Sequence, residues 1–94
     1  MSRPYIAVID PGHGGRDPGA LANNIQEKDV NLEVALRLRK YVVQGDYLFT
    51  PFLTRGDDHY VSLQQRCDNA NTAKASLPNK RTYWHWLSSI TTTF

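Results

Sequence analysis

A histidine stands in a glycine-rich turn near the start of the chain. Residues 10–15 read Asp-Pro-Gly-His-Gly-Gly and directly follow a short apolar run at residues 5–9. Such a turn places His13 at the carboxyl end of a buried strand, which is where α/β sheets position their ligands. The small neighbours leave room around the imidazole for a metal ion and a substrate. The alternative is a glycine turn that contains an incidental histidine.

A glutamate follows at a position that faces the same edge. Glu27 lies fourteen residues after His13 and directly precedes a segment with helical periodicity. Histidine together with glutamate is a familiar ligand pair for catalytic zinc, which takes three protein ligands and keeps one position open. Alternatively, Glu27 only interacts favourably with the positive end of the helix dipole. Asp29 is expected to be the N-cap of that helix.

Two further polar residues are candidates for supporting roles. Asp10 precedes His13 by three residues and could accept a hydrogen bond from the free ring nitrogen, which would orient the imidazole as a ligand. Asp10 could equally cap the loop. Arg55 ends a second apolar segment and is a candidate for binding an anionic group of a substrate. The alternative is a surface arginine that pairs with Asp57 or Asp58.

Alternating strand and helix patterns are expected to position these side chains. The predicted elements are, in order, a strand at 5–9, a loop at 10–28, a helix at 30–43, a strand at 47–54 and a second helix at about 62–75. Pro51 is expected to bend the second strand. Ser62 followed by Gln65 predicts a capping box at the start of the second helix. This order predicts an α/β fold with a mixed or mostly parallel twisted sheet flanked by helices.

Length and composition exclude several classes of protein. With 94 residues, of which 40% are apolar and 21% charged, the chain is one globular domain at most and is expected to be marginally stable. Residues 1–77 hold nine basic and nine acidic side chains, which argues against a nucleic-acid-binding face. No apolar run predicts a membrane span or a signal peptide. The single Cys67 excludes an intrachain disulfide and a multi-cysteine zinc site.

The composition changes after Leu77. Residues 78–94 contain both tryptophans, a run of serine and threonine, and the whole net charge of +2 through Lys80 and Arg81. They show neither a helical nor a strand period. We therefore predict two parts, with residues 1–77 as the body of the domain and residues 78–94 as an unrelated or disordered tail.

The residues around His13 and Glu27 belong to a longer pattern. The pattern consists of IAVIDPGHGGRDPGA at 6–20, QEKDVNL at 26–32, LTR at 53–55 and VSLQQR at 61–66. In this order and spacing it closely resembles the zinc-dependent N-acetylmuramoyl-L-alanine amidases, which cleave bacterial peptidoglycan. The resemblance covers about residues 5–77. It implies that His13 and Glu27 are the first two zinc ligands.

The resemblance also implies a reaction and a setting. Members of the family hydrolyse the amide bond between N-acetylmuramic acid and L-alanine with a zinc-activated water. Peptidoglycan is therefore the expected partner and Zn²⁺ the expected cofactor. That substrate implies a periplasmic or extracellular location, or lysis from inside a phage-infected cell. The alternative is a non-catalytic fragment that binds peptidoglycan or metal.

Two functional residues of the family have no counterpart in the pattern. The family's third zinc ligand is a histidine in an S-I-H-A segment that by spacing falls at Thr82, and its catalytic glutamate falls beyond Phe94. The resemblance thus implies an incomplete amidase domain, inactive by itself, whose catalytic residue is unknown. His59 and His85 are expected to be ordinary histidines. If zinc nevertheless binds tightly, His85 is the first candidate for a replacement ligand and His59 the second.

Overall fold

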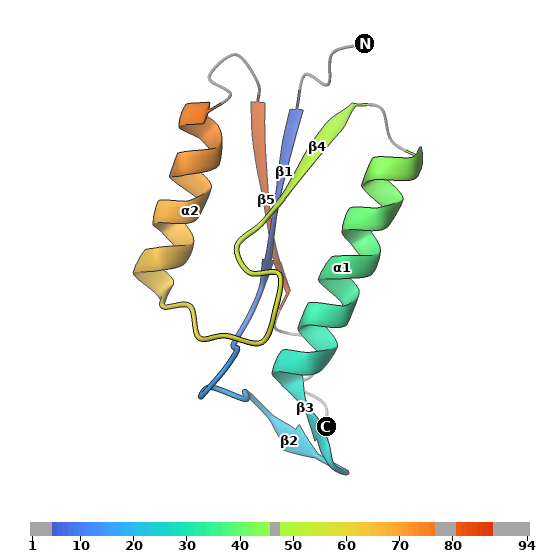
Figure 1. The fold of residues 1–94 in the computed structure, drawn as a ribbon, viewed down its shortest axis with the longest axis vertical. Coiled ribbons are helices and arrows are strands. Elements are labelled where there is room, and N and C mark those ends of the chain that lie inside the picture. The colour runs from blue at the N-terminus through green and yellow to red at the C-terminus, as the bar shows by residue number, and fades with distance from the viewer. Residues whose placement is uncertain (1–4, 46–47, 77–80, 88–94) are drawn as a thin grey trace.

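Two helices and a sheet account for most of the described chain, residues 5–45, 48–76 and 81–87 of a computed structural model (Figure 1). The elements are β1 (Tyr5–Pro11), β2 (Leu21–Ala22), β3 (Ile25–Gln26), α1 (Glu27–Gly45), β4 (Phe49–Leu53), α2 (Leu63–Ser76) and β5 (Arg81–Leu87). β2 and β3 form a short antiparallel ribbon of their own. Within the described residues, no helix combines the length and apolar character needed to cross a membrane.

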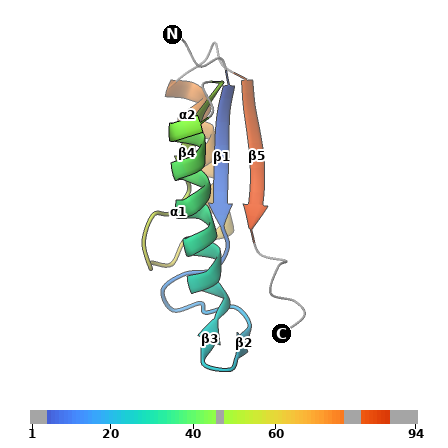
Figure 2. The same cartoon turned by 90° about the vertical axis from the view of Figure 1, so that its right-hand side faces the viewer.

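The β-branched run near the start of the chain forms the central strand. β1 pairs in parallel with β4 on one side and with β5 on the other, so the order of the sheet is β4-β1-β5. Parallel neighbours need crossover connections, and the segments containing α1 and α2 provide them. α2 and α1 lie on opposite faces of the sheet (Figure 1). In the view turned by 90°, β4, β1 and β5 follow one another across the sheet (Figure 2). The predicted α/β fold with a mostly parallel sheet is confirmed.

Each face of the sheet carries its own apolar cluster. The cluster toward α2 comprises Ile6, Val8, Phe52, Ala70 and Ala73, and the cluster toward α1 comprises Ile9, Ala35, Leu38 and Leu53. Because successive side chains of a strand point to opposite faces, the neighbours Val8 and Ile9 serve different clusters. Among the described side chains, the buried apolar ones that the helices contribute are alanines, so the helices add little apolar bulk to either cluster.

The predicted N-cap is found at the start of α2 but not at the start of α1. α2 begins after Ser62, whose Oγ accepts a hydrogen bond from the Gln65 N–H at 3.1 Å, as expected for an N-cap. The Gln65 side chain donates to Asn69 Oδ1 along the helix. α1 begins at Glu27, so Asp29 lies inside its first turn and is not the predicted N-cap.

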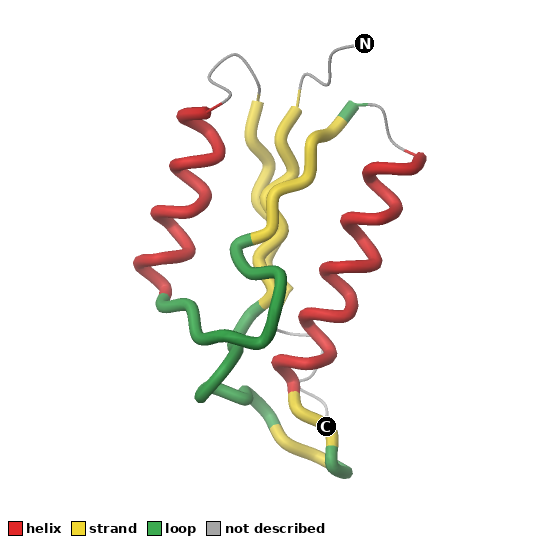
Figure 3. Tube along the Cα trace, viewed as in Figure 1, coloured by secondary structure: helices red, strands yellow, loops and turns green. Residues whose placement is uncertain are grey.

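The loop between β1 and α1 closes the start of α1 with its own backbone. The Glu27 N–H donates to Ala20 O at 2.9 Å, and the Lys28 N–H donates to Pro18 O at 3.0 Å. These carbonyls satisfy N–H groups that have no partner within a helix. Figure 3 shows this loop at the carboxyl ends of the strands, next to the start of α1. The loop and the first turn of α1 are thus fixed to each other.

The described part of the last segment differs from the predicted tail. β5 pairs with β1 along its length, from Arg81 opposite Tyr5 to Leu87 opposite Pro11. The prediction of disorder is therefore corrected for residues 81–87, which form a strand of the sheet, while the prediction that the segment is unrelated to the rest stays a prediction. Residues 78–80 and 88–94 lie outside the described residues. The overlooked indication was composition, since threonine, tyrosine and tryptophan favour strands even where no period is visible.

Candidate active site

The loop that follows β1 turns sharply through consecutive residues with positive φ. His13, Gly14 and Gly15 have φ values of 64°, 135° and 55°. The Gly14 N–H donates to Asp17 O at 2.8 Å, and the Asp17 N–H returns a bond to Gly14 O at 3.0 Å. A Cβ at Gly14 would lie 2.1 Å from the carbonyl oxygen of His59, so the packing admits only glycine there. Left-handed backbone at a residue such as His13 is uncommon and is often found at functional sites.

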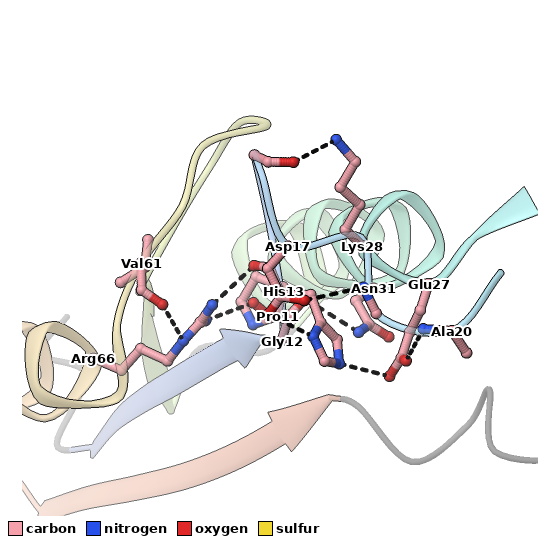
Figure 4. A network of polar contacts seen from close by, with 12 residues as sticks. Pro11, Gly12, His13, Asp17, Ala20, Glu27, Lys28, Asn31, Val61 and Arg66 are labelled. Carbon is pink, nitrogen blue, oxygen red and sulfur yellow. Dashed lines mark hydrogen bonds and ion pairs between the residues drawn. The ribbon is translucent and has the colours of Figure 1, made fainter.

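This turn and the start of α1 bring His13 and Glu27 together. Nε2 of His13 lies 3.2 Å from Oε2 of Glu27, and the two side chains are 27% and 8% exposed. The other carboxylate oxygen of Glu27 accepts the Ala20 N–H at 2.9 Å, which fixes the group. A Cβ at Gly19 would lie 2.7 Å from the His13 ring, so this glycine leaves the space that the ring occupies. Figure 4 shows the two side chains pointing toward one another.

Asp17 occupies the other ring nitrogen of His13. Its Oδ2 lies 2.9 Å from Nδ1 of His13, and its Oδ1 accepts the Gly19 N–H at 3.2 Å. The hydrogen bond with His13 is the main cause that lowers the pKa of Asp17, against the opposing effect of burial. Nδ1 of His13 is placed to donate a hydrogen bond to the Asp17 carboxylate. With its proton on Nδ1, the imidazole would offer Nε2 to a metal ion.

The predicted orienting residue, Asp10, lies away from the imidazole. Asp10 is fully buried, and its Oδ1 accepts hydrogen bonds from Thr54 Oγ1 at 2.6 Å and from Arg66 Nη1 at 2.7 Å. The structure thus corrects the prediction for Asp10, because Asp17 is the residue bonded to His13. Asp10 belongs to β1, so the sheet fixes its direction before the chain turns. The four-residue spacing of His13 and Asp17 within the glycine turn could have indicated the true partner.

Arg55 is buried beneath the loop rather than open to a substrate. Arg55 is only 2% exposed. Its donors bond to the carbonyl oxygens of Pro11 at 3.1 Å, Gly12 at 3.0 Å, Lys28 at 2.8 Å and Asp57 at 2.9 Å. Burial is the main cause that lowers the pKa of Arg55, and the like charge of Arg66 acts in the same direction. The structure therefore corrects the substrate-binding role predicted for Arg55 to a role in holding the loop.

The possible metal ligands form a pair rather than a set of three. Among the residues that the structure describes, no group of three or more His, Cys, Asp or Glu side chains is arranged to hold a metal ion. His59 contacts Asp57 on the surface instead of joining the pair. The side chain of His85 lies outside the described residues, and the register of β5 places its backbone opposite Ile9. His13 and Glu27 are thus the two adjacent donors of the site.

A cavity of about 230 Å³ opens beside the imidazole. Its lining consists of His13, Asp17, Tyr60, Val61, Leu63 and Arg66. Tyr60 and Leu63 are exposed, which gives the cavity an apolar rim. The guanidinium of Arg16 stacks over the ring of Tyr60 at 4.3 Å from its centroid, so this part of the rim is held in place. The cavity offers room for one group of a ligand that binds at His13.

Comparison with known proteins decides the family. The family model described as N-acetylmuramoyl-L-alanine amidase matches residues 7–78. This chain belongs to the N-acetylmuramoyl-L-alanine amidase family. The matched segment includes the turn with His13, all of α1, α2 and β4, and β1 from residue 7 onward. The resemblance predicted from the sequence pattern is confirmed, and the match ends before β5.

Two curated amidases align with the same segment. A putative N-acetylmuramoyl-L-alanine amidase of Buchnera aphidicola subsp. Schizaphis graminum is 52% identical over 62 residues, which are 65% of this chain and 26% of that protein. A probable N-acetylmuramoyl-L-alanine amidase of Haemophilus influenzae is 44% identical over 78 residues, which are 81% of this chain and 18% of that protein. This chain therefore spans about a quarter or less of the length of these relatives.

A solved amidase has the same fold over this segment. The catalytic domain of CwlV, an N-acetylmuramoyl-L-alanine amidase from Bacillus (Paenibacillus) polymyxa var. colistinus, matches with a TM-score of 0.69 and 36% identity. The match covers 74% of this chain and 40% of that chain. The amidase-family segment described here therefore corresponds to less than half of that catalytic domain.

Proposed function

We propose that this segment serves the hydrolysis of the amide bond between N-acetylmuramic acid and L-alanine in peptidoglycan, by a zinc-activated water. The observation that carries the proposal is the 3.2 Å approach of His13 to Glu27 within the segment matched by the amidase family. The proposal concerns a complete domain, since this chain covers only part of its relatives. Peptidoglycan as the substrate supports a periplasmic or extracellular location.

The donor pair fits a zinc ion. Two ligands about 2.0 Å from one tetrahedral ion are about 3.3 Å apart, and Nε2 of His13 lies 3.2 Å from Oε2 of Glu27. The bond of Asp17 to Nδ1 is the arrangement that orients metal-bound histidines. Zinc bound by His13 and Glu27 would polarise the amide carbonyl and lower the pKa of a bound water to about 7. Catalytic zinc takes a third protein ligand, which the described residues do not supply.

The chain's own residues set up the site before any substrate arrives. Asp17 lies within hydrogen-bond distance of Nδ1 of His13 and holds the ring with Nε2 turned toward Glu27. The Ala20 N–H holds one oxygen of Glu27, which directs the other oxygen and its charge toward His13. The cavity beside His13 admits one group of the substrate. A positioned general base typically contributes about 10²–10⁴ in rate, and we assign that role to a residue outside these 94.

A chimaera tests this function. Residues 5–77 of this chain would replace the matching segment of the CwlV catalytic domain. We expect zinc-dependent release of peptide stems from purified sacculi, and loss of release with a chelator or in the His13→Ala variant. Glu33→Ala is the matched control, because Glu33 forms an ion pair with Arg37 on the exposed side of α1 and has no part in the His13–Glu27 pair. A folded chimaera without zinc-dependent release would contradict the proposal.

A second candidate function is binding without hydrolysis. It is favoured by the presence of two metal donors, rather than three, among the described residues. The 94-residue chain alone is expected to show no stem release, since the described residues supply no third ligand and we assign the base to a residue outside these 94. Measuring sacculus-bound chain and released stems in the same sample separates the two functions. Zinc-dependent release by the 94-residue chain alone would show that it already contains a working site.

A further inference from the structure

Two buried arginines enclose the backbone of the turn that carries His13. We name Arg55 and Arg66 the arginine cradle; they are 2% and 3% exposed. Their bonds run from Arg55 Nε to Pro11 O at 3.1 Å, from Arg66 Nη1 to Pro11 O at 2.7 Å, from Arg55 Nη2 to Gly12 O at 3.0 Å and from Arg66 Nη2 to His13 O at 2.8 Å. Three successive carbonyls of the turn thus accept hydrogen bonds from two guanidinium groups.

The shape of the turn explains why it needs such partners. The chain leaves the sheet after Pro11, the last residue of β1, and its left-handed backbone at His13 departs from both strand and helix. The carbonyls of Gly12 and His13 therefore lie beyond the strand and need other partners. A non-glycine residue keeps such a conformation only where its surroundings over-determine it. Here the surroundings are two planar groups whose donors are fixed in a fork. Asn31 adds a neutral donor from α1, 3.2 Å from Gly12 O.

Arg66 is itself held in one position by buried partners. Its Nη1 pairs with Asp10 Oδ1 at 2.7 Å, and its Nε donates to Val61 O at 3.1 Å. Thr54 Oγ1 donates to the same Asp10 oxygen at 2.6 Å. Figure 4 shows Arg66 reaching from α2 past Val61 to the turn. The cradle therefore links α2 and the central strand to the backbone of His13.

We propose that Arg66, assisted by Arg55, is a positioning residue that holds the His13 backbone in the left-handed turn, so that Nε2 meets Glu27 and Nδ1 meets Asp17. The proposal rests on the proposed function only in that the positioned pair binds zinc. This role differs from a contribution to stability alone, because the guanidinium group of Arg66 would set the position of the His13 imidazole. Replacing the guanidinium group should therefore alter the surroundings of the His13 imidazole in a chain that is still folded.

Arg66→Lys tests the fork while it keeps the charge opposite Asp10. A single ammonium nitrogen cannot serve the carbonyls of Val61, Pro11 and His13 at once, as three guanidinium nitrogens do. In the 94-residue chain without metal, we expect the imidazole ¹⁵N and Nδ1–H resonances of His13 to move toward those of a free histidine. We expect zinc affinity, measured by calorimetry, to fall about 10–100-fold, as it does when the groups that orient a ligand are lost.

Asn69→Ala is the matched control. Asn69 lies on α2 three residues after Arg66 and also donates to a backbone carbonyl, but that carbonyl is Thr54 O, at 3.1 Å, and not one of the turn. This variant should lower the melting temperature and leave the His13 resonances and the zinc affinity unchanged. A purely structural role for Arg66 predicts that the two variants behave alike once they are compared at equal folded fraction.

The outcomes separate the cradle from the proposed function. If Arg66→Lys does not fold, Arg55→Lys carries the same test, and Asn31→Ala follows if neither lysine variant folds. Unchanged His13 resonances and a zinc affinity within about two-fold of wild type, in the first of these variants that folds, would overturn the proposal. Changed resonances support it even where sacculi are not hydrolysed. Loss of hydrolysis in the chimaera that carries the substitution, with unchanged His13 resonances in the 94-residue chain, would count against the cradle and leave the proposed function intact.

Discussion

The middle of the sheet and its carboxyl end are held to the helices in different ways. In the middle, the buried contributions of α1 and α2 are the small apolar side chains of Ala35, Ala70 and Ala73. At the carboxyl end, the contacts are buried and polar, and the ion pair of Asp10 with Arg66 lies at their centre. The described helices therefore meet the sheet through thin apolar clusters at one level and through a dense polar network at the other.

This difference predicts where the chain is sensitive to substitution. Deleting a methyl group from a thin apolar cluster costs about 0.5–1.5 kcal/mol. Removing one partner of a buried ion pair costs about 3–5 kcal/mol, because the remaining charge is left without compensation. Because this polar network also bonds the backbone of the turn that carries His13, substitutions that destabilise it should also alter the geometry of the site. The predictions below compare the polar end with the apolar middle or with the exposed surface.

The largest effect is expected at the buried ion pair. Arg66→Met removes the ion-pair partner of the buried Asp10 carboxylate, so the free energy of unfolding should fall by about 3–5 kcal/mol. That is a large share of the about 5–15 kcal/mol typical of a domain. Ile6→Val, in the apolar middle, should cost about 0.5–1.5 kcal/mol. Urea denaturation followed by circular dichroism measures both, and equal shifts of the midpoint would remove the contrast between the two regions.

Zinc binding should depend on the pair at the polar end and not on the exposed face of α1. His13→Ala and Glu27→Ala each remove one of two donors, so zinc affinity should fall at least about 10–100-fold. Wild type itself should bind far more weakly than a structural site, whose binding free energy is about 10–16 kcal/mol. Isothermal calorimetry provides the measurement, with Glu33→Ala as the control. Equal zinc uptake by all four proteins would disprove the assignment of the ligands.

The glycine of the turn and the glycine at the end of α1 should respond oppositely to alanine. At Gly14 the φ of 135° and a Cβ position 2.1 Å from His59 O predict a loss of about 1–3 kcal/mol or more for Gly14→Ala. At Gly45 a Cβ meets nothing within 4 Å, so Gly45→Ala should be neutral or stabilise by about 0.4–1 kcal/mol. Thermal unfolding of both variants checks the signs. A stable Gly14→Ala chain would mean that the turn can relax.

The sequence predicted the parts of this molecule that local rules control. The strand at 5–9 and the cap at Ser62 follow from composition and from the backbone needs of a helix end, and both are confirmed. The approach of His13 to Glu27 also followed, because a strand end and a helix start meet at one edge of an α/β sheet. These features depend on neighbours in the chain or on a general property of the fold.

The partners of the buried charges could not be predicted in the same way. Asp10 and Arg66 are 56 residues apart, and Arg55 reaches Pro11 across 44 residues. Nothing in the local pattern states that an arginine on α2 will be buried, because arginine is normally exposed. Predicting Asp10 as the partner of His13 placed too much weight on short separation. The sheet sets the direction of each side chain on β1, and sequence spacing alone does not reveal that direction.

The smallest effect is expected at the exposed side of the same turn. Lys28 Nζ lies 2.7 Å from Asp58 Oδ2 and also donates to Gly15 O at 3.0 Å, and Asp58 Oδ1 accepts the Gly15 N–H at 2.8 Å. The hydrogen bond from Lys28 is the main cause that lowers the pKa of Asp58 below its usual value of 3.8, followed by the bond from Gly15. In contrast to the buried pair, this pair has one exposed member, since the Asp58 side chain is 51% exposed and that of Lys28 12%, so salt should weaken it.

A pKa that is lower in the folded chain has a definite consequence for stability. The unfolded chain binds the proton more readily, so the contribution of Asp58 is complete above about pH 3.8 and is lost as pH falls through the lower folded pKa. Asp58→Asn should therefore melt slightly below wild type at pH 7, and the difference should vanish in acid. It should also shrink in 1 M sodium chloride, whereas the deficit of Arg66→Met should persist because that pair is buried. A difference between wild type and Asp58→Asn that stays constant from pH 7 to pH 2 would show that the carboxylate charge of Asp58 does not stabilise the turn.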